Sequence, residues 1–107
     1  MKNDRYYLER IKTDLKFVTD HTAGKKQEDI EQDEVLLDSI LFRIVQIAEN
    51  NSKLSGQIKT EHPDVPWMAI KGMRNRIVHD YGYLDLGIIY DTVVNGFPQM
   101  YDALSKI

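Results

Sequence analysis

The chain has 107 residues, of which 42% are hydrophobic and 29% charged, and its formal net charge is −3. This length and composition predict a single globular domain over residues 1–107. A domain that binds nucleic acid through sequence-independent phosphate contacts is usually basic, so any nucleic-acid role here must depend on a local patch. The chain has no cysteine, which excludes disulfides, thiolate catalysis and cysteine-ligated metal sites.

The apolar residues recur with a helical period along nearly the whole chain. The first run predicts a helix over residues 4–19, with Asp4 as its N-cap and a break around Gly24. The acidic run that follows opens the next helix, because carboxylates complement the positive end of a helix dipole. We prefer this interpretation to a metal site. His21 and His62 stand in predicted loops without ligand spacing, so we expect surface histidines, no metal and no cofactor.

The second predicted helix covers about residues 30–55. Its apolar stripe is wider than one neighbouring helix needs, and a helix that is apolar over more than one face is buried on several sides. In so small a chain a second copy is a good candidate for the extra cover, so the sequence predicts a homodimer. The stripe consists of Val35, Leu36, Leu37, Ile40, Leu41, Ile44, Val45, Ile47 and Ala48.

Two more helices complete the predicted fold. The third runs from Trp67 to about His79. The last covers about residues 84–104, with a kink or short break at Gly96 and Pro98. No strand-like alternation appears, so the sequence predicts an all-α, antiparallel four-helix bundle-like domain.

Location is predicted from the N-terminal segment and the length of the apolar runs. The N-terminal segment is too charged for a signal peptide. No apolar run approaches the ~18 residues that a membrane span needs. We therefore expect a cytoplasmic protein with no membrane association.

The stretch "MRNRIVHDYGY", residues 73–83, departs from the amphipathic pattern. Arg74 and His79 are five positions apart on the third predicted helix, which separates them by roughly 140° around its axis. They can converge only if the helix loosens near His79 or if a second copy supplies a partner. Asn75 and His79 are four positions apart and are therefore neighbours.

Taken singly, these residues have structural explanations. A histidine near a helix C-terminus interacts favourably with the dipole, and Tyr81 and Tyr83 can be half-buried packing residues. Together they fit metal-free RNA cleavage, in which the 2′-hydroxyl attacks the adjacent phosphate. An arginine fork binds phosphate oxygens, a histidine passes protons, and a tyrosine donates a hydrogen bond or stacks on a base. Lys71 and Arg76 complete this basic cluster, and we expect them to bind RNA.

The residues "RNRIVHDY" (74–81) match the R-x4-H-x-Y motif of HEPN domains, in the RN-x-x-V-H-x-Y form typical of HepT-like toxins. The segment "LLDSILFRIVQIAEN" resembles the long second helix of that family, with Glu49 at its acidic position. The likeness covers nearly the whole chain, which therefore resembles the HepT-like toxins of the HEPN superfamily.

This resemblance implies an all-α HEPN domain that forms a homodimer, with the two motifs facing a shared cleft. It implies a metal-independent endoribonuclease that is the toxin of a type II toxin–antitoxin system. The antitoxin partner would be an MntA-like minimal nucleotidyltransferase, which adds AMP to the motif tyrosine, Tyr81, and can join the dimer in a larger complex. An adenylyl group there would occupy the anion site that RNA needs.

Roles for the motif residues follow from the resemblance and from their chemistry. Arg74 binds the scissile phosphate and stabilises its developing charge, and His79 is the general base or acid. Asn75 orients His79 or a phosphate oxygen, and Tyr81 borders the cleft. If the second helix packs on the third, Glu49 holds Arg74 or receives a hydrogen bond of its own from the cleft.

Two other interpretations stay open. In the first, the same cleft holds a nucleotide or docks a nucleotidyltransferase without any cleavage, which the acidic net charge slightly favours. In the second, the chain is an interaction bundle whose motif only shapes the dimer. The second predicts that His79→Ala lowers stability and dimerisation.

Overall fold

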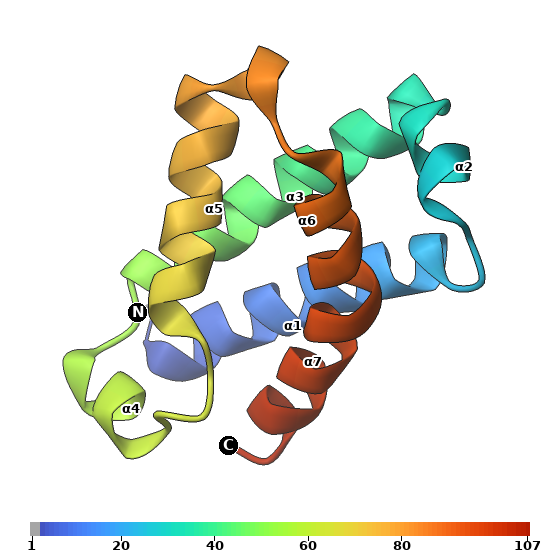
Figure 1. Ribbon diagram of the computed structural model, residues 1–107. Helices are drawn as coiled ribbons and strands as arrows, with labels where there is room; N and C mark the ends of the chain where they lie inside the picture. The colour runs from blue at the N-terminus through green and yellow to red at the C-terminus, as the bar shows by residue number, and fades with distance from the viewer. Residues whose placement is uncertain (1–2) are drawn as a thin grey trace.

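The computed structural model describes residues 3–107, and every regular element in that range is helical (Figure 1). The all-α prediction is confirmed. No helix in this range combines the length and the apolar character that crossing a membrane requires. The elements are α1 (Asp4–Thr22), α2 (Gln27–Glu31), α3 (Glu34–Ser52), α4 (Gly56–Glu61), α5 (Trp67–His79), the 3-10 turn η1 (Tyr81–Tyr83), α6 (Leu86–Asp91), the π-helical segment η2 (Thr92–Gly96) and α7 (Phe97–Ser105).

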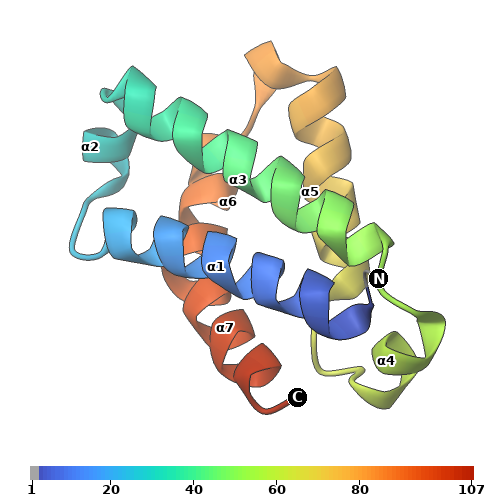
Figure 2. The ribbon, with the colours of Figure 1, turned by 180° about the vertical axis from the view of Figure 1, so that it is seen from behind.

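The long helices form two antiparallel pairs that cross each other. Helices α1 and α3 lie side by side and run in opposite directions (Figure 2). Helix α5 and the continuous α6–η2–α7 segment run in opposite directions across them (Figure 1). Helix α5 packs on α3, and α7 packs on α1. The C-terminal half of the chain is therefore held on the α1–α3 pair.

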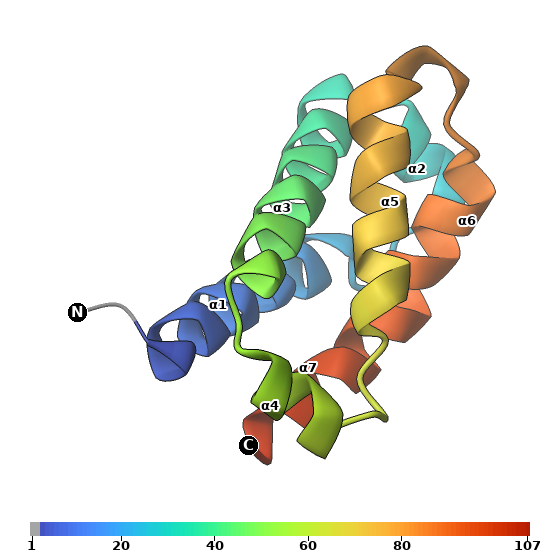
Figure 3. The same cartoon turned by 90° about the vertical axis from the view of Figure 1, so that its left-hand side faces the viewer.

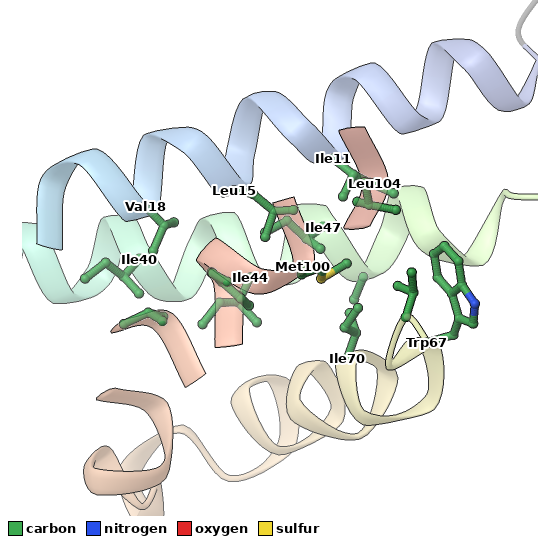
Figure 4. Packing of buried hydrophobic residues seen from close by; sticks show 14 of the residues in the cluster. Ile11, Leu15, Val18, Ile40, Ile44, Ile47, Trp67, Ile70, Met100 and Leu104 are labelled. Atoms are coloured by element: carbon green, nitrogen blue, oxygen red, sulfur yellow. The ribbon is translucent and has the colours of Figure 1, made fainter. Parts of the chain in front are cut away.

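The core lies where these helices meet, and Figure 4 shows its centre. Helices α1 and α3 each contribute a stripe at helical spacing, and α5 and α7 cover it. Burial of each such side chain contributes ~1.5–3 kcal/mol to folding. The buried side chains labelled in the figure are Ile11, Leu15, Val18, Ile40, Ile44, Ile47, Trp67, Ile70, Met100 and Leu104.

The start of α1 corrects one prediction. Asn3, not Asp4, is the N-cap, and its side chain accepts a hydrogen bond from the Tyr6 N–H. Asp4 instead accepts hydrogen bonds from the backbone N–H and the hydroxyl of Ser55, at 2.9 and 2.6 Å. The Asp4 carboxylate, which local capping preferences predicted as the N-cap, is therefore used in a tertiary contact instead. This contact ties the start of α1 to the start of α4.

The second predicted helix is two helices. Asp33 begins α3 by accepting a hydrogen bond from the Leu36 N–H, which separates α3 from the short α2 and moves its start from the predicted position 30. Most of the wide apolar stripe is covered inside the chain, because α3 contacts α1, α2 and α5. Its width therefore requires no second copy. Val35 and the neighbouring Phe42 remain 79% and 59% exposed.

Helix α4 was not predicted, because the sequence pattern assigned no element between the end of the second predicted helix, at about residue 55, and Trp67. Ser55 caps α4 through the Ile58 N–H, and Ile58 anchors it in the core. The predicted third helix is confirmed as α5.

The break expected in the last helix is present as the η2 segment. The Phe97 N–H bonds to the Thr92 carbonyl, five residues back. Pro98 follows at once and has no N–H to donate, so the α-helical ladder cannot continue unbroken through this point.

Candidate active site

Arg74 is fixed by residues of two helices. Its Nε–H donates to Glu49 Oε1 on α3 at 3.0 Å, and its Nη1 donates to Asn75 Oδ1 at 3.1 Å. The Arg74 side chain is 33% exposed. The Nη2 amino group has no partner within residues 3–107. The guanidinium is therefore oriented at its Nε edge and open at its outer edge, where an anion can bind it.

His79 lies in the last turn of α5 and is exposed. The helix keeps its α-helical bonding to its end, since the Asp80 N–H donates to the Arg76 carbonyl at 2.8 Å. Arg74 and His79 thus remain roughly 140° apart around the axis. In the described part of the chain, no hydrogen bond or ion pair joins His79 to Arg74 or Asn75. Loosening of the helix does not bring the pair together.

Tyr81 follows on η1 and is 55% exposed. Its hydroxyl donates a hydrogen bond to Asp38 Oδ1 on α3. This hydrogen bond is the main reason that the pKa of Tyr81 is raised, and desolvation and the negative charges of Asp38 and Glu34 add to the effect. Asp38 was not predicted as a site residue. It lies eleven positions before Glu49, which places both on one face of α3.

Replacing Asp38 with Asn is expected to lower the pKa of Tyr81 towards its ordinary value near 10. The carboxylate favours the neutral phenol, so this contact stabilises the fold fully below pH ~10 and loses effect as the pH rises through the higher pKa of the folded state. The measurement is a pH titration of ¹³Cζ-labelled tyrosine by NMR. Tyr83, on the same turn and 92% exposed, is the internal control. An unchanged Tyr81 titration would mean that Asp38 does not hold the hydroxyl.

Lys71 and Arg76, which were expected to bind RNA, line different grooves. Lys71 shares with Arg74 and Asn75 a groove bounded by the end of α3, by α4 and by α5, which we call the α4 groove. Arg76 lines a separate groove between α5 and α6. The structure therefore brings Lys71, but not Arg76, to the side of Arg74.

Lys59 of α4 also lines the α4 groove and was missed. The reason is that α4 itself was not predicted.

An exposed apolar strip runs along the α3–α5 seam. The pairs Glu49–Arg74 and Asp38–Tyr81 mark its two ends. Phe42 and Val78, which are 59% and 48% exposed, fall between them by helical spacing. We call this strip the seam face.

The other histidines lie apart from this region. His21 belongs to the last turn of α1 rather than to a loop, where its Nδ1 lies 2.7 Å from the Phe17 carbonyl oxygen and its ring stacks on Phe17. His62 is half-buried at the end of α4. Across residues 3–107, no three His, Cys, Asp or Glu side chains gather closely enough to hold a metal ion.

The chain is similar to known proteins over most of its length. The family described as "Ribonuclease HepT-like" matches residues 11–107. "Putative RNase TTE0752" of Caldanaerobacter subterraneus subsp. tengcongensis is 30% identical over 107 residues, covering 100% of this chain and 96% of that protein. "Probable ribonuclease HepT" of Thermococcus cleftensis is 23% identical over 106 residues, covering 99% of this chain and 96% of that protein. No solved structure gives a significant match.

Proposed function

This chain belongs to the ribonuclease HepT-like family, and from that premise we propose that it is a metal-independent endoribonuclease and the toxin of a type II toxin–antitoxin system. The observation that carries the proposal is the anchored Arg74. Glu49 and Asn75 fix two of its nitrogens, while its outer edge faces solvent next to the α4 groove. A pre-oriented guanidinium stabilises a phosphate whose negative charge grows during reaction.

The proposed reaction needs only the chain's own side chains. His79 takes the proton of the RNA 2′-hydroxyl, whose oxygen attacks the adjacent phosphorus. The bond from phosphorus to the 5′-oxygen breaks, a cyclic phosphate forms, and the departing oxygen receives a proton from the His79 imidazolium. Arg74 stabilises the charge on the phosphate oxygens. Asn75 accepts from Arg74 through Oδ1, so its Nδ2 is the group left to orient His79 or a phosphate oxygen.

The separation of Arg74 and His79 on a regular helix supports a homodimer. Two copies facing each other across the seam face would place His79 of one copy near Arg74 of the other. The exposed Phe42 suits such an interface, because aromatic side chains dominate the energetics of interface centres.

Replacing Phe42 with Glu is therefore expected to weaken the dimer at least ~30-fold, which is the effect of losing one strong interface anchor. Light scattering coupled to size exclusion over a range of concentrations measures it. Ile88→Glu is the control, since Ile88 is 48% exposed on α6 away from the seam face. A dimer that Phe42→Glu leaves intact would exclude this interface.

Neutralisation by an MntA-like nucleotidyltransferase is supported by the position of Tyr81. Its oxygen would attack the α-phosphate of ATP, releasing pyrophosphate and the phenolic proton. The new ester removes the hydroxyl that donates to Asp38 and sets a phosphate charge opposite that carboxylate. Like-charge repulsion would turn the adenylyl group away from Asp38 and towards the basic side of the seam face.

The function is tested by incubating the purified dimer with RNA before and after treatment with a nucleotidyltransferase of this kind and ATP. We expect cleavage before treatment, none after it, and a mass increase of one AMP unit that Tyr81→Phe prevents and Tyr83→Phe does not. An unmodified dimer that binds RNA or nucleotide without cutting it would replace this proposal with the non-catalytic binding or docking subunit.

A further inference from the structure

The α4 groove extends well beyond Arg74. It lies where the end of α3, the short α4 and the first part of α5 come together (Figure 3). Along α5 it reaches from Trp67 to Asn75, which is about 12 Å at 1.5 Å per residue. Its volume is about 380 Å³, within the usual range of small-molecule sites. The groove is therefore large enough for a nucleotide beside the phosphate bound by Arg74.

The lining of the groove is positively charged in an acidic chain. Three cations face it, from Lys59, Lys71 and Arg74, against the single carboxylate of Glu49, so the local balance is +2 where the whole chain has −3. The Glu49 carboxylate is already bound by Arg74. Within residues 3–107, neither lysine forms an ion pair. Such a gathering of uncompensated cations attracts an anionic ligand.

One further carboxylate acts on Lys59 from outside the groove. The pKa of Asp4 is lowered chiefly by the hydrogen bonds from Ser55, and the charge of Lys59 adds a smaller effect. Asp4 accepts both of its hydrogen bonds from Ser55, and among the described residues it forms no ion pair with Lys59. The ammonium group remains available to a phosphate.

Apolar surface lies beside these cations. Met68 is 76% exposed, and Ala48 and the nearly buried Trp67 form part of the lining. The Trp67 indole N–H donates to the His62 carbonyl, so the ring offers a fixed apolar surface rather than a free donor. Cations next to apolar side chains match the two parts of a nucleotide, its phosphate and its base.

We propose that the α4 groove binds the RNA nucleotide that flanks the scissile phosphate, with Lys59 and Lys71 contacting its phosphate and Met68 packing against its base. The inference rests on the proposed function, because Arg74 marks where the scissile phosphate lies. Lys59 is then a substrate-binding residue supplied by α4.

Lys59→Ala tests the subsite, with Lys25→Ala as the control. Lys25 is an exposed lysine in the segment between α1 and α2, and this segment lies on the opposite side of the molecule from α4 (Figure 1). The probe is a fluorescent single-stranded 2′-O-methyl oligonucleotide, which lacks the attacking hydroxyl and stays intact. Fluorescence anisotropy at several salt concentrations gives its affinity and its salt dependence. We expect Lys59→Ala to weaken binding ~5-fold and to reduce the slope of log K against log[salt] by ~0.7, the value for one lost phosphate contact on a single strand.

The subsite is overturned if Lys59→Ala binds the oligonucleotide like wild type and Lys25→Ala. Lys71 is exposed on α5, and we expect Lys71→Ala to weaken binding in the same way. This variant replaces Lys59→Ala if circular dichroism shows that Lys59→Ala does not fold. Cleavage of the matching unmodified RNA is measured in parallel. If binding depends on Lys59 but the RNA is not cleaved, the nuclease proposal is refuted and the subsite proposal stands. If Lys59→Ala cleaves RNA and binds the oligonucleotide as wild type does, only the subsite proposal is refuted.

Discussion

His79→Ala is expected to lower the rate of RNA cleavage by ~10²–10⁴-fold, the contribution usual for a positioned general acid or base. The variant should fold and bind RNA nearly as wild type does, because His79 is exposed and lies outside the buried core. Cleavage of a fluorogenic RNA under single-turnover conditions measures the rate, and thermal unfolding measures the stability.

His21→Ala is the matched control, since His21 is also an exposed histidine in the last turn of a helix. It should cleave at the wild-type rate. If His79→Ala instead loses dimerisation and stability together with activity, the motif shapes the dimer and has no direct role in proton transfer.

Arg74→Lys is expected to reduce cleavage by ~10²–10³-fold although it keeps the positive charge. Lysine lacks the planar fork that binds phosphate oxygens in pairs and the Nε–H that Glu49 holds. Affinity for RNA should fall much less than the cleavage rate, because the charge itself remains. The two effects are separated by measuring binding with the 2′-O-methyl oligonucleotide and cleavage with RNA.

Arg5→Lys is the control for this change, because Arg5 also pairs with a glutamate, Glu9, at 3.3 Å. Both pairs are partly or largely exposed, and such pairs contribute only ~0–1 kcal/mol to stability. Unfolding therefore does not explain a large loss of activity. Equal cleavage by Arg74→Lys and Arg5→Lys would remove Arg74 from phosphate stabilisation.

The long helices could be predicted because each repeats its apolar residues over several turns. The bounds of α5 were predicted as observed, since Pro66 precedes it and its polar end follows. Helix α4 has only six residues, too few for a periodic signal, and it depends on Ser55 and the burial of Ile58. The boundary between α2 and α3 depends on a single cap at Asp33.

The site was predictable only along one helix. The separation of Arg74 and His79 around α5 follows from their spacing, and Arg76, two positions after Arg74, necessarily lies about 200° away around the axis. Tyr81 meets Asp38, and Lys59 comes to the groove of Arg74, only because separate helices pack together. No local pattern predicts such pairings. Glu49 was predicted from the family resemblance, and in the structure its Oε1 accepts a hydrogen bond from the Arg74 Nε–H.

The most direct test is to incubate the purified protein, shown by intact mass to be unmodified, with a defined RNA in EDTA and to determine the chemistry of the new ends. The account predicts fragments that carry a 2′,3′-cyclic phosphate and are absent with His79→Ala. No cleavage by the unmodified protein, cleavage only after Mg²⁺ is added, or equal cleavage by His79→Ala would contradict it.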